Sequence, residues 1–314
     1  MREYLLIIFA GLIATSLYNF FSCLLRALGN STVPLVFLAV SALLNIGLDL
    51  LFVAVFRWGI AGAACATVFA QYVSGIGILL YVLFCCRNLL PSGRDLHFDR
   101  NILKEIAGLS SLTCLQQSVM NFGILVVQGL VNSFGATTMA AFAAAVKIDT
   151  FAYLPVQDFG NAYSTFVAQN YGAGNKERIR RGTKEAFAIS TVFSLLSSAL
   201  VCAFAAPLMQ IFVSASETAV ITSGVRYLRI EGAFYFGIGC LFLLYGYYRA
   251  IKRAEMSVVL TVISLGTRVL LAYMLSATAI GEVGIWMAIP IGWVLADLTG
   301  PVSYTHLTLP TTPY

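Results

Sequence analysis

The chain has 314 residues, of which 19 are Lys or Arg and 14 are Asp or Glu, giving a formal net charge of +5. Apolar residues make up 59% of the sequence and charged residues only 11%, whereas soluble domains contain about 45–50% apolar and about 25% charged residues. This balance excludes a soluble enzyme, a nucleic-acid-binding protein and a disordered tail, and it predicts an integral membrane protein.

Long runs without acidic or basic residues support this prediction. They are continuous, unlike the alternating strands of a membrane barrel, and they reach the roughly 20 apolar residues that a membrane-spanning helix needs. We therefore expect an all-α polytopic membrane protein with nine transmembrane helices, separated by turns at Gly29, Gly59, Gly135, Gly174 and Gly281. The predicted spans are residues 4–25, 33–56, 59–86, 106–132, 138–170, 186–212, 227–248, 256–278 and 283–300.

The distribution of Lys and Arg predicts the orientation of these spans. Of the 19, 13 lie in alternate loops that begin with the turn after the first span, and four lie in the loops of the opposite side. Because positively charged loops stay in the cytoplasm, we expect the first set, which includes the polar linker 87–104, to be cytoplasmic. The basic segment 176–184 of this set is expected to contact anionic membrane lipids.

An internal repeat with an offset of 223 residues relates the first three spans to the last three. Tyr4 corresponds to Tyr227, and after a slippage of two residues Gly59 corresponds to Gly284. Spans four to six have no partner, so we expect three further helices upstream of Met1 in the parent sequence. Two six-helix halves would then be present, which is typical of transporters.

Four short motifs stand in the turn after the first span, within the second, in the third and at the end of the fifth. They are Leu28-Gly29-Asn30, Asn45–Asp49, Gly59–Ala64 followed by Thr67 and Gln71, and Val167–Gly174. Their order and spacing resemble the MATE family of multidrug and toxin extrusion transporters, most closely the bacterial MepA-like exporters. The resemblance covers residues 1–300 and implies an inside-out V of two six-helix lobes, with this chain carrying helices four to twelve.

The resemblance also implies a domain organisation. Residues 1–86 are the second half of the N-lobe, residues 87–104 the cytoplasmic linker between the lobes, and residues 105–301 the six-helix C-lobe. Residues 302–314 are rich in Thr and Pro and interrupt the apolar periodicity; they resemble a translated sequencing adapter, so we expect a non-native tail. Because half of the first lobe is missing, we expect no transport by residues 1–314 alone.

A cation site is predicted in the N-lobe. Asn45 and Asp49 are four residues apart, so they share one face of their helix, and a carboxylate beside an amide oxygen suits Na⁺. The same carboxylate could instead carry a proton, and Thr67 and Tyr4 on the neighbouring spans could add a hydroxyl and a phenol. The resemblance implies the same four residues as the N-lobe cation site. In the alternative interpretation, Asp49 only contributes to helix packing near the outer surface.

The repeat makes the two lobes chemically unequal. At the offset of 223, Asn45 becomes Arg268 and Asp49 becomes Ala272. The second lobe therefore lacks the acid at this position, and we place cation coupling in the first lobe. Arg268 could form a structural pair with Glu231 or take a functional role, because ionisable groups inside a membrane require partners.

A substrate path is predicted in the C-lobe. Lys147 and Asp149 lie in a span that Pro155 is expected to kink, and they point about 200° apart, so they do not pair directly. Gln117 and Asn121 would add polar lining, and Glu231 a further charge. The alternative is a set of internal ion pairs between helices.

Together with these features, the resemblance implies a MATE-type secondary antiporter that exports amphipathic organic cations or drugs in exchange for Na⁺ or H⁺ by rocking of its two lobes. The alternative is a flippase of the same superfamily for lipid-linked oligosaccharides or peptidoglycan precursors, but its cavity should be cationic, and here Lys and Arg lie mostly in loops. The sequence has no phosphate-binding loop, metal motif or catalytic pair, so we expect neither a cofactor nor enzymatic activity. We expect a monomer in the bacterial inner membrane, with small organic cations or drugs and membrane lipids as partners and no nucleic acid.

Overall fold

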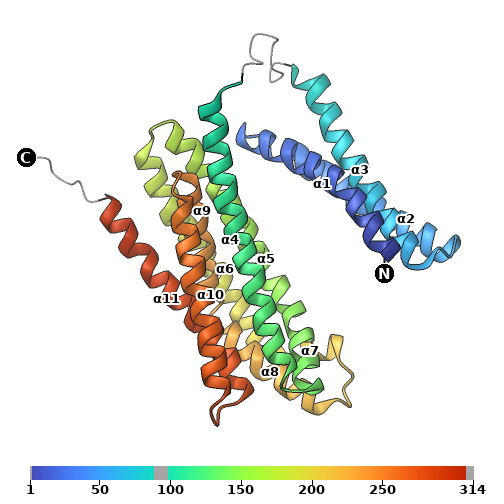
Figure 1. Ribbon diagram of the computed structural model, residues 1–314, viewed down its shortest axis with the longest axis vertical. Helices are drawn as coiled ribbons and strands as arrows, with labels where there is room; N and C mark the ends of the chain where they lie inside the picture. Colours follow the sequence, from blue (N-terminus) through green and yellow to red (C-terminus); the bar gives the residue numbers. More distant parts are fainter. Residues whose placement is uncertain (1, 88–97, 309–314) are drawn as a thin grey trace, which may run out of the picture. The chain divides into compact units, whose positions relative to one another are not determined.

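The computed structural model describes the backbone of residues 2–87 and 98–308, and their side chains except at residues 3 and 301–308. All regular elements in these two segments are helices, as predicted (Figure 1). The chain divides into two compact units, unit 1 from Met1 to Asp99 and unit 2 from Arg100 to Tyr314. The helix that opens unit 2 begins at Arg100, so the last residues of the expected linker are helical.

Unit 1 is a bundle of three membrane-length helices in which the first and second both pack against the third. Small residues bring them close, since a Cβ atom on Gly75 would lie 2.7 Å from the carbonyl oxygen of Ala14. Such close approach at glycine is the usual way in which membrane helices associate. The elements are α1 (Arg2–Ala27), α2 (Thr32–Asp49), the π-helix η1 (Leu50–Val55) and α3 (Gly59–Cys85).

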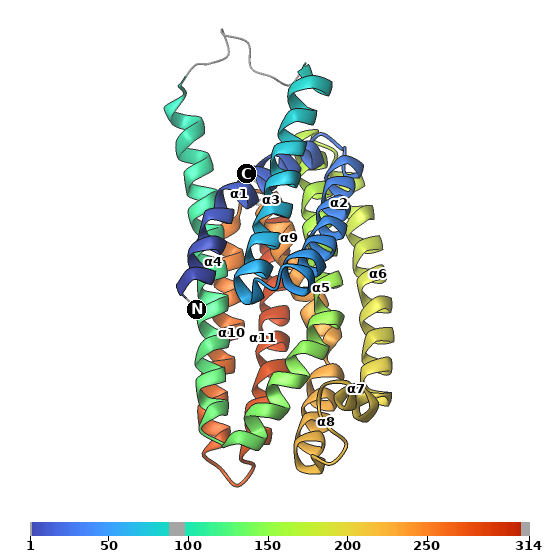
Figure 2. The same ribbon diagram turned by 90° about the vertical axis from the view of Figure 1, so that its right-hand side faces the viewer.

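Unit 2 is a larger bundle whose core lies among α5, α8, α9, α10 and α11 (Figure 2). Its centre is aromatic, because the Phe142 and Trp286 rings stack with centroids 5.5 Å apart and Tyr227 meets Trp286 edge-on at 5.0 Å. The elements are α4 (Arg100–Asn132), α5 (Ala136–Gly172), α6 (Lys176–Ala203), α7 (Ala205–Phe212), α8 (Thr218–Gly232), α9 (Tyr235–Ala250), α10 (Ala254–Ser276) and α11 (Glu282–Thr308).

The predicted number of spans is confirmed, with two corrections to their continuity. Among the described residues, eight helices are long and apolar enough to cross a membrane, and nine are counted when α8 and α9 form one span bent by 51°. The predicted span 186–212 is interrupted after Ala203, because Pro207 has no N–H to donate to the Ala203 carbonyl. The predicted span 227–248 is interrupted at Phe234, whose N–H bonds three residues back to Glu231 at 3.0 Å.

The predicted turns and the alternation of the loops also agree with the structure. The residues Gly29, Gly59, Gly135, Gly174 and Gly281 all have positive φ, a conformation that glycine adopts without steric cost.

At one end of unit 2, Lys252 of the α9–α10 turn pairs with Glu105 near the start of α4, which raises the pKa of Lys252. At the other end, Glu282 accepts hydrogen bonds from Thr138 and Ser223; we call this the outer end, following the predicted orientation.

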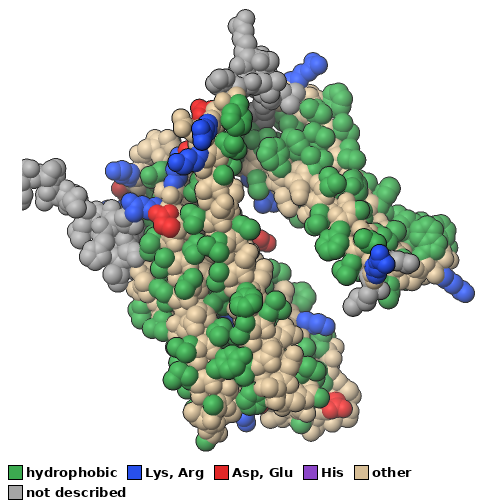
Figure 3. All heavy atoms as spheres, in the orientation of Figure 1, with side chains coloured by type: hydrophobic (Ala, Val, Ile, Leu, Met, Phe, Trp, Pro, Cys, Tyr) green, Lys and Arg blue, Asp and Glu red, His purple; other side chains and the backbone are tan. Residues whose placement is uncertain are grey.

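The surface of each unit is that of a membrane protein. Large apolar side chains point outward, including Ile60 (74% exposed), Phe84 (76%) and Phe122 (69%). In Figure 3, hydrophobic side chains cover the length of α4 and α10, and charged side chains gather near the end where α4 begins. Exposed apolar area on this scale requires another apolar phase to cover it, which the lipid bilayer provides.

Candidate functional site

Unit 1 brings three of its four predicted cation ligands to one seam between α2 and α3. The Asn45 amide nitrogen donates to the Thr67 hydroxyl over 3.5 Å, and that hydroxyl donates to the Ala63 carbonyl at 3.0 Å. Asp49 follows Asn45 by one helical turn, so it lies on the same face of α2. Its Oδ1 atom is buried and has no hydrogen-bond partner in the described part of the chain.

The backbone changes form directly after this carboxyl group. Asp49 is the last residue of α2, and η1 begins at Leu50, where the Phe56 N–H bonds to the Leu51 carbonyl at 2.9 Å. A π-helical turn is rare and often lies at a functional site. The fourth predicted ligand, Tyr4, is half-buried on α1, and within the described residues no hydrogen bond joins it to the other three.

Unit 2 contains a more deeply buried cluster, which we call the acidic cluster: Asp149, Tyr227, Glu231, Tyr235 and Arg268. Asp149 and Glu231 are 5% and 6% exposed, and their carboxyl groups are close enough to interact with each other and with Tyr227. The Tyr235 hydroxyl donates a short hydrogen bond to Asp149 Oδ1. Four helices, α5, α8, α9 and α10, thus place polar groups at one point inside a membrane-spanning bundle.

The predicted pairing of Arg268 with Glu231 is not a direct ion pair. Both salt bridges found among the described residues are elsewhere, and the buried Nε atom of Arg268 has no hydrogen-bond partner there. The Arg268 guanidinium nevertheless acts on both carboxyl groups at longer range. Asp149 Oδ2 and Glu231 Oε2 also lack a hydrogen-bond partner among the described residues, so the cluster retains capacity for a proton or a cation.

The other residues of the predicted substrate path lie outside the acidic cluster. Gln117 and Asn121 are exposed on α4, where the neighbouring Gln116 is the buried amide. Lys147 is exposed on α5 and therefore points away from the buried Asp149, which confirms that the two do not pair. Asp158, a further acid of the same helix, is exposed on the face of α5 that carries Lys147.

Two polar groups of unit 2 were not predicted. The role of Tyr235 as a donor to Asp149 depends on the bend between α8 and α9, which the sequence pattern does not reveal. Asp297 lies within the membrane span of α11, with a buried Oδ1 atom that has no partner in the described chain. Asp297 is an acid inside the predicted span 283–300, and this position alone marks it as a candidate functional residue.

Comparisons with known proteins agree with this architecture. The MatE family model matches residues 113–274. The chain is 32% identical over 307 residues to a probable multidrug resistance protein, YpnP, of Bacillus subtilis, covering 97% of this chain and 68% of that protein. It is 26% identical over 300 residues to the probable multidrug resistance protein NorM of Thermotoga maritima, covering 91% of this chain and 62% of that protein.

A solved structure shows the same fold. The outward-facing conformation of a multidrug resistance MATE family transporter superposes with a TM-score of 0.91 at 25% identity, over 98% of this chain and 70% of that one. The chain therefore spans about two thirds of the length of the proteins that it resembles.

Proposed function

The chain belongs to the MATE family, whose members are transporters and not enzymes, and on this premise we propose that it works in a secondary antiporter of the bacterial inner membrane. The antiporter exports amphipathic organic cations or drugs in exchange for Na⁺ or H⁺, as a monomer and without a cofactor. The names of the two relatives, both probable multidrug resistance proteins, support this choice of substrate.

The observation that carries the coupling proposal is the unpartnered carboxyl oxygen of Asp49. An acid inside a membrane span is costly unless it binds a partner, and here Oδ1 is buried without one among the described residues. Asn45, one helical turn before Asp49, is hydrogen-bonded to Thr67 of α3. These two side chains add neutral oxygen atoms. A Na⁺ ion would find hard oxygen ligands there, and a proton would neutralise the same carboxylate.

The exposed polar residues of unit 2 support the proposed substrate path. Gln117 and Asn121 are one turn apart on α4, and Lys147 and Asp158 lie on one face of α5. Polar and charged side chains on a membrane-spanning helix almost always face a bundle interior or a water-filled cavity. A path lined by α4 and α5 would allow a charged or polar substrate to cross the membrane.

Gradient-driven efflux tests the proposal. The gene, with any coding sequence continuous with it, is expressed and reconstituted in proteoliposomes, and ethidium efflux is followed under imposed Na⁺ or H⁺ gradients. Asp49→Asn keeps the shape of the side chain but removes its charge and its titratable proton, so we expect efflux to lose its dependence on the gradient. The matched control, Asp149→Asn, should alter rate or substrate range but keep this dependence.

Two outcomes would contradict parts of the proposal. If Asp49→Asn keeps gradient-driven efflux while Asp149→Asn or Glu231→Gln abolishes it, coupling resides in the acidic cluster of unit 2. If the same proteoliposomes flip a fluorescent lipid-linked oligosaccharide and do not move ethidium, the flippase alternative replaces the drug exporter.

A further inference from the structure

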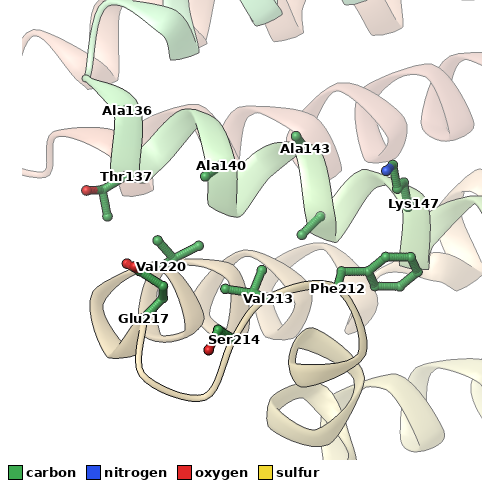
Figure 4. Close-up of a pocket in the computed structure, with 11 residues that line it drawn as sticks. Ala136, Thr137, Ala140, Ala143, Lys147, Phe212, Val213, Ser214, Glu217 and Val220 are labelled. Atoms are coloured by element: carbon green, nitrogen blue, oxygen red, sulfur yellow. The ribbon is translucent and has the colours of Figure 1, made fainter.

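A pocket of about 570 Å³ opens on the surface of unit 2 near its outer end. One wall is the exposed face of α5, which presents the small residues Ala136, Ala140 and Ala143 in succession (Figure 4). The opposite wall is formed by the end of α7, the turn before α8 and the first residues of α8. The alanine side chains leave a trough between the walls, and its volume is within the range of small-molecule sites in proteins.

One end of the trough carries an unpaired positive charge. The Lys147 Nζ atom lies 5.8 Å from the centre of the Phe212 ring, and Figure 4 shows these two side chains together at one end of the pocket. A cation–π contact stabilises the ammonium group but leaves its charge unneutralised. Neither salt bridge found in the described part of the chain involves Lys147, although an ammonium group on a membrane-spanning helix is costly without an anionic partner.

The other end of the trough carries hydrogen-bonding oxygens. Thr137 and Glu217 lie at this end and Ser214 lies between Glu217 and Phe212 (Figure 4), and Glu217 is exposed. Because α5 rises 1.5 Å per residue, Lys147 is about 16 Å along the helix from the start of the pocket at Ala136. An anion would therefore be attracted to the Lys147 end and repelled by the Glu217 carboxylate at the other.

We propose that this pocket binds an amphipathic organic anion: its carboxylate, sulfonate or phosphate rests on Lys147 beside Phe212, its apolar body lies on the alanines of α5, and its other end points hydrogen-bond donors at Glu217. This inference rests on the proposed function, because the pocket occupies the outer part of the same α5 face that carries Asp158. It extends the substrates to anions, whereas the exporter proposed above takes organic cations.

Equilibrium binding of matched probes tests this assignment. The full chain is placed in phosphatidylcholine nanodiscs and titrated calorimetrically with 1-naphthylacetate, its neutral amide, and 2-(1-naphthyl)ethylamine as the cation, with empty nanodiscs as the blank. We expect the acid to bind at least tenfold more tightly than the amide. Lys147→Met should remove this preference without weakening the amide, and Lys147→Arg should keep it.

A second cation of the outer end provides the control. Arg226 is exposed on α8 and lines a different pocket, so Arg226→Met should leave the preference for the acid unchanged. Equal binding of acid and amide by the unmodified chain would overturn the proposal. So would an equal loss in Arg226→Met and Lys147→Met, or a loss of acid and amide together in Lys147→Met. No gradient is imposed, so failure here leaves the antiport proposal standing, and failure of gradient-driven efflux leaves anion binding standing.

Discussion

The contact between α5 and α9 yields the sharpest prediction, because two glycine backbones meet there. A Cβ atom on Gly246 of α9 would lie 2.6 Å from the Gly160 carbonyl oxygen of α5 and 3.4 Å from the Ser164 Cβ atom. Backbone atoms cannot turn away as the end of a flexible side chain can. In Gly246→Ala, ordinary contact at 3.4 Å therefore requires the two helices to separate by about 0.8 Å.

The magnitude follows from two opposing terms. Overpacking of a well-packed interior costs about 1–3 kcal/mol, while replacement of glycine by alanine inside a helix returns about 0.5–1 kcal/mol of helix stability. We expect Gly246→Ala to lose about 1–2 kcal/mol net. Gly266 of α10 is the matched control, since a Cβ atom there would meet nothing within 4 Å, and Gly266→Ala should gain up to about 1 kcal/mol.

The assay is reversible unfolding in detergent, followed by tryptophan fluorescence. Trp286 and Trp293 are buried in unit 2, whereas Trp58 is exposed in unit 1, so the signal reports mainly on the unit that carries the substitution. If Gly246→Ala is as stable as the unmodified chain, or gains as much as Gly266→Ala, then α5 and α9 are not packed through these glycines.

Three further predictions concern buried polar groups. Tyr235→Phe removes the donor to Asp149 and should lower the free energy of unfolding by about 1.5–3 kcal/mol; unchanged denaturant unfolding would contradict the hydrogen bond. Glu282→Ala leaves two hydroxyl groups at the outer end without their acceptor and should cost about 1–3 kcal/mol, and a melting temperature equal to that of the unmodified chain would count against this role. Arg268→Gln leaves two adjacent carboxyl groups without their countercharge, so its stability should rise with added Na⁺ more than that of the unmodified chain; thermal unfolding across a NaCl series, with choline chloride as the ionic-strength control, decides this.

The fold was predictable because its signals are continuous along the chain. Apolar runs with few or no charged residues mark the spans, and each predicted turn glycine adopts the positive φ that favours glycine. The bend between α8 and α9 was not predictable by the same means, since the run remains apolar through Phe234 and the break depends on local hydrogen bonds. The interruption near Pro207 carried a usable signal, because proline removes one helical donor.

The candidate sites were predictable only where helical periodicity places the residues. Asn45 and Asp49 share a face by their spacing alone, and Lys147 and Asp149 diverge by theirs. Contacts across helices follow instead from packing angles and from small residues such as Gly246, which a single sequence does not position in space. The acidic cluster is assembled from four helices by such contacts, so the sequence alone did not predict it.

The contrast between the two units favours coupling in unit 1 on electrostatic grounds. The repeat pairs Tyr4 with Tyr227 and Asn45 with Arg268, so the acidic cluster occupies the position in unit 2 that the predicted cation site occupies in unit 1. In unit 2 the carboxyl groups of Asp149 and Glu231 already interact electrostatically with a positive charge that belongs to the chain, the guanidinium of Arg268. In unit 1 the counterpart of Arg268 is the neutral Asn45. The buried Oδ1 atom of Asp49 lacks a hydrogen-bond partner in the described part of the chain. A fixed cation cannot be exchanged across the membrane, whereas an ion or proton taken from solution can, and this difference supports our proposal that coupling resides in unit 1.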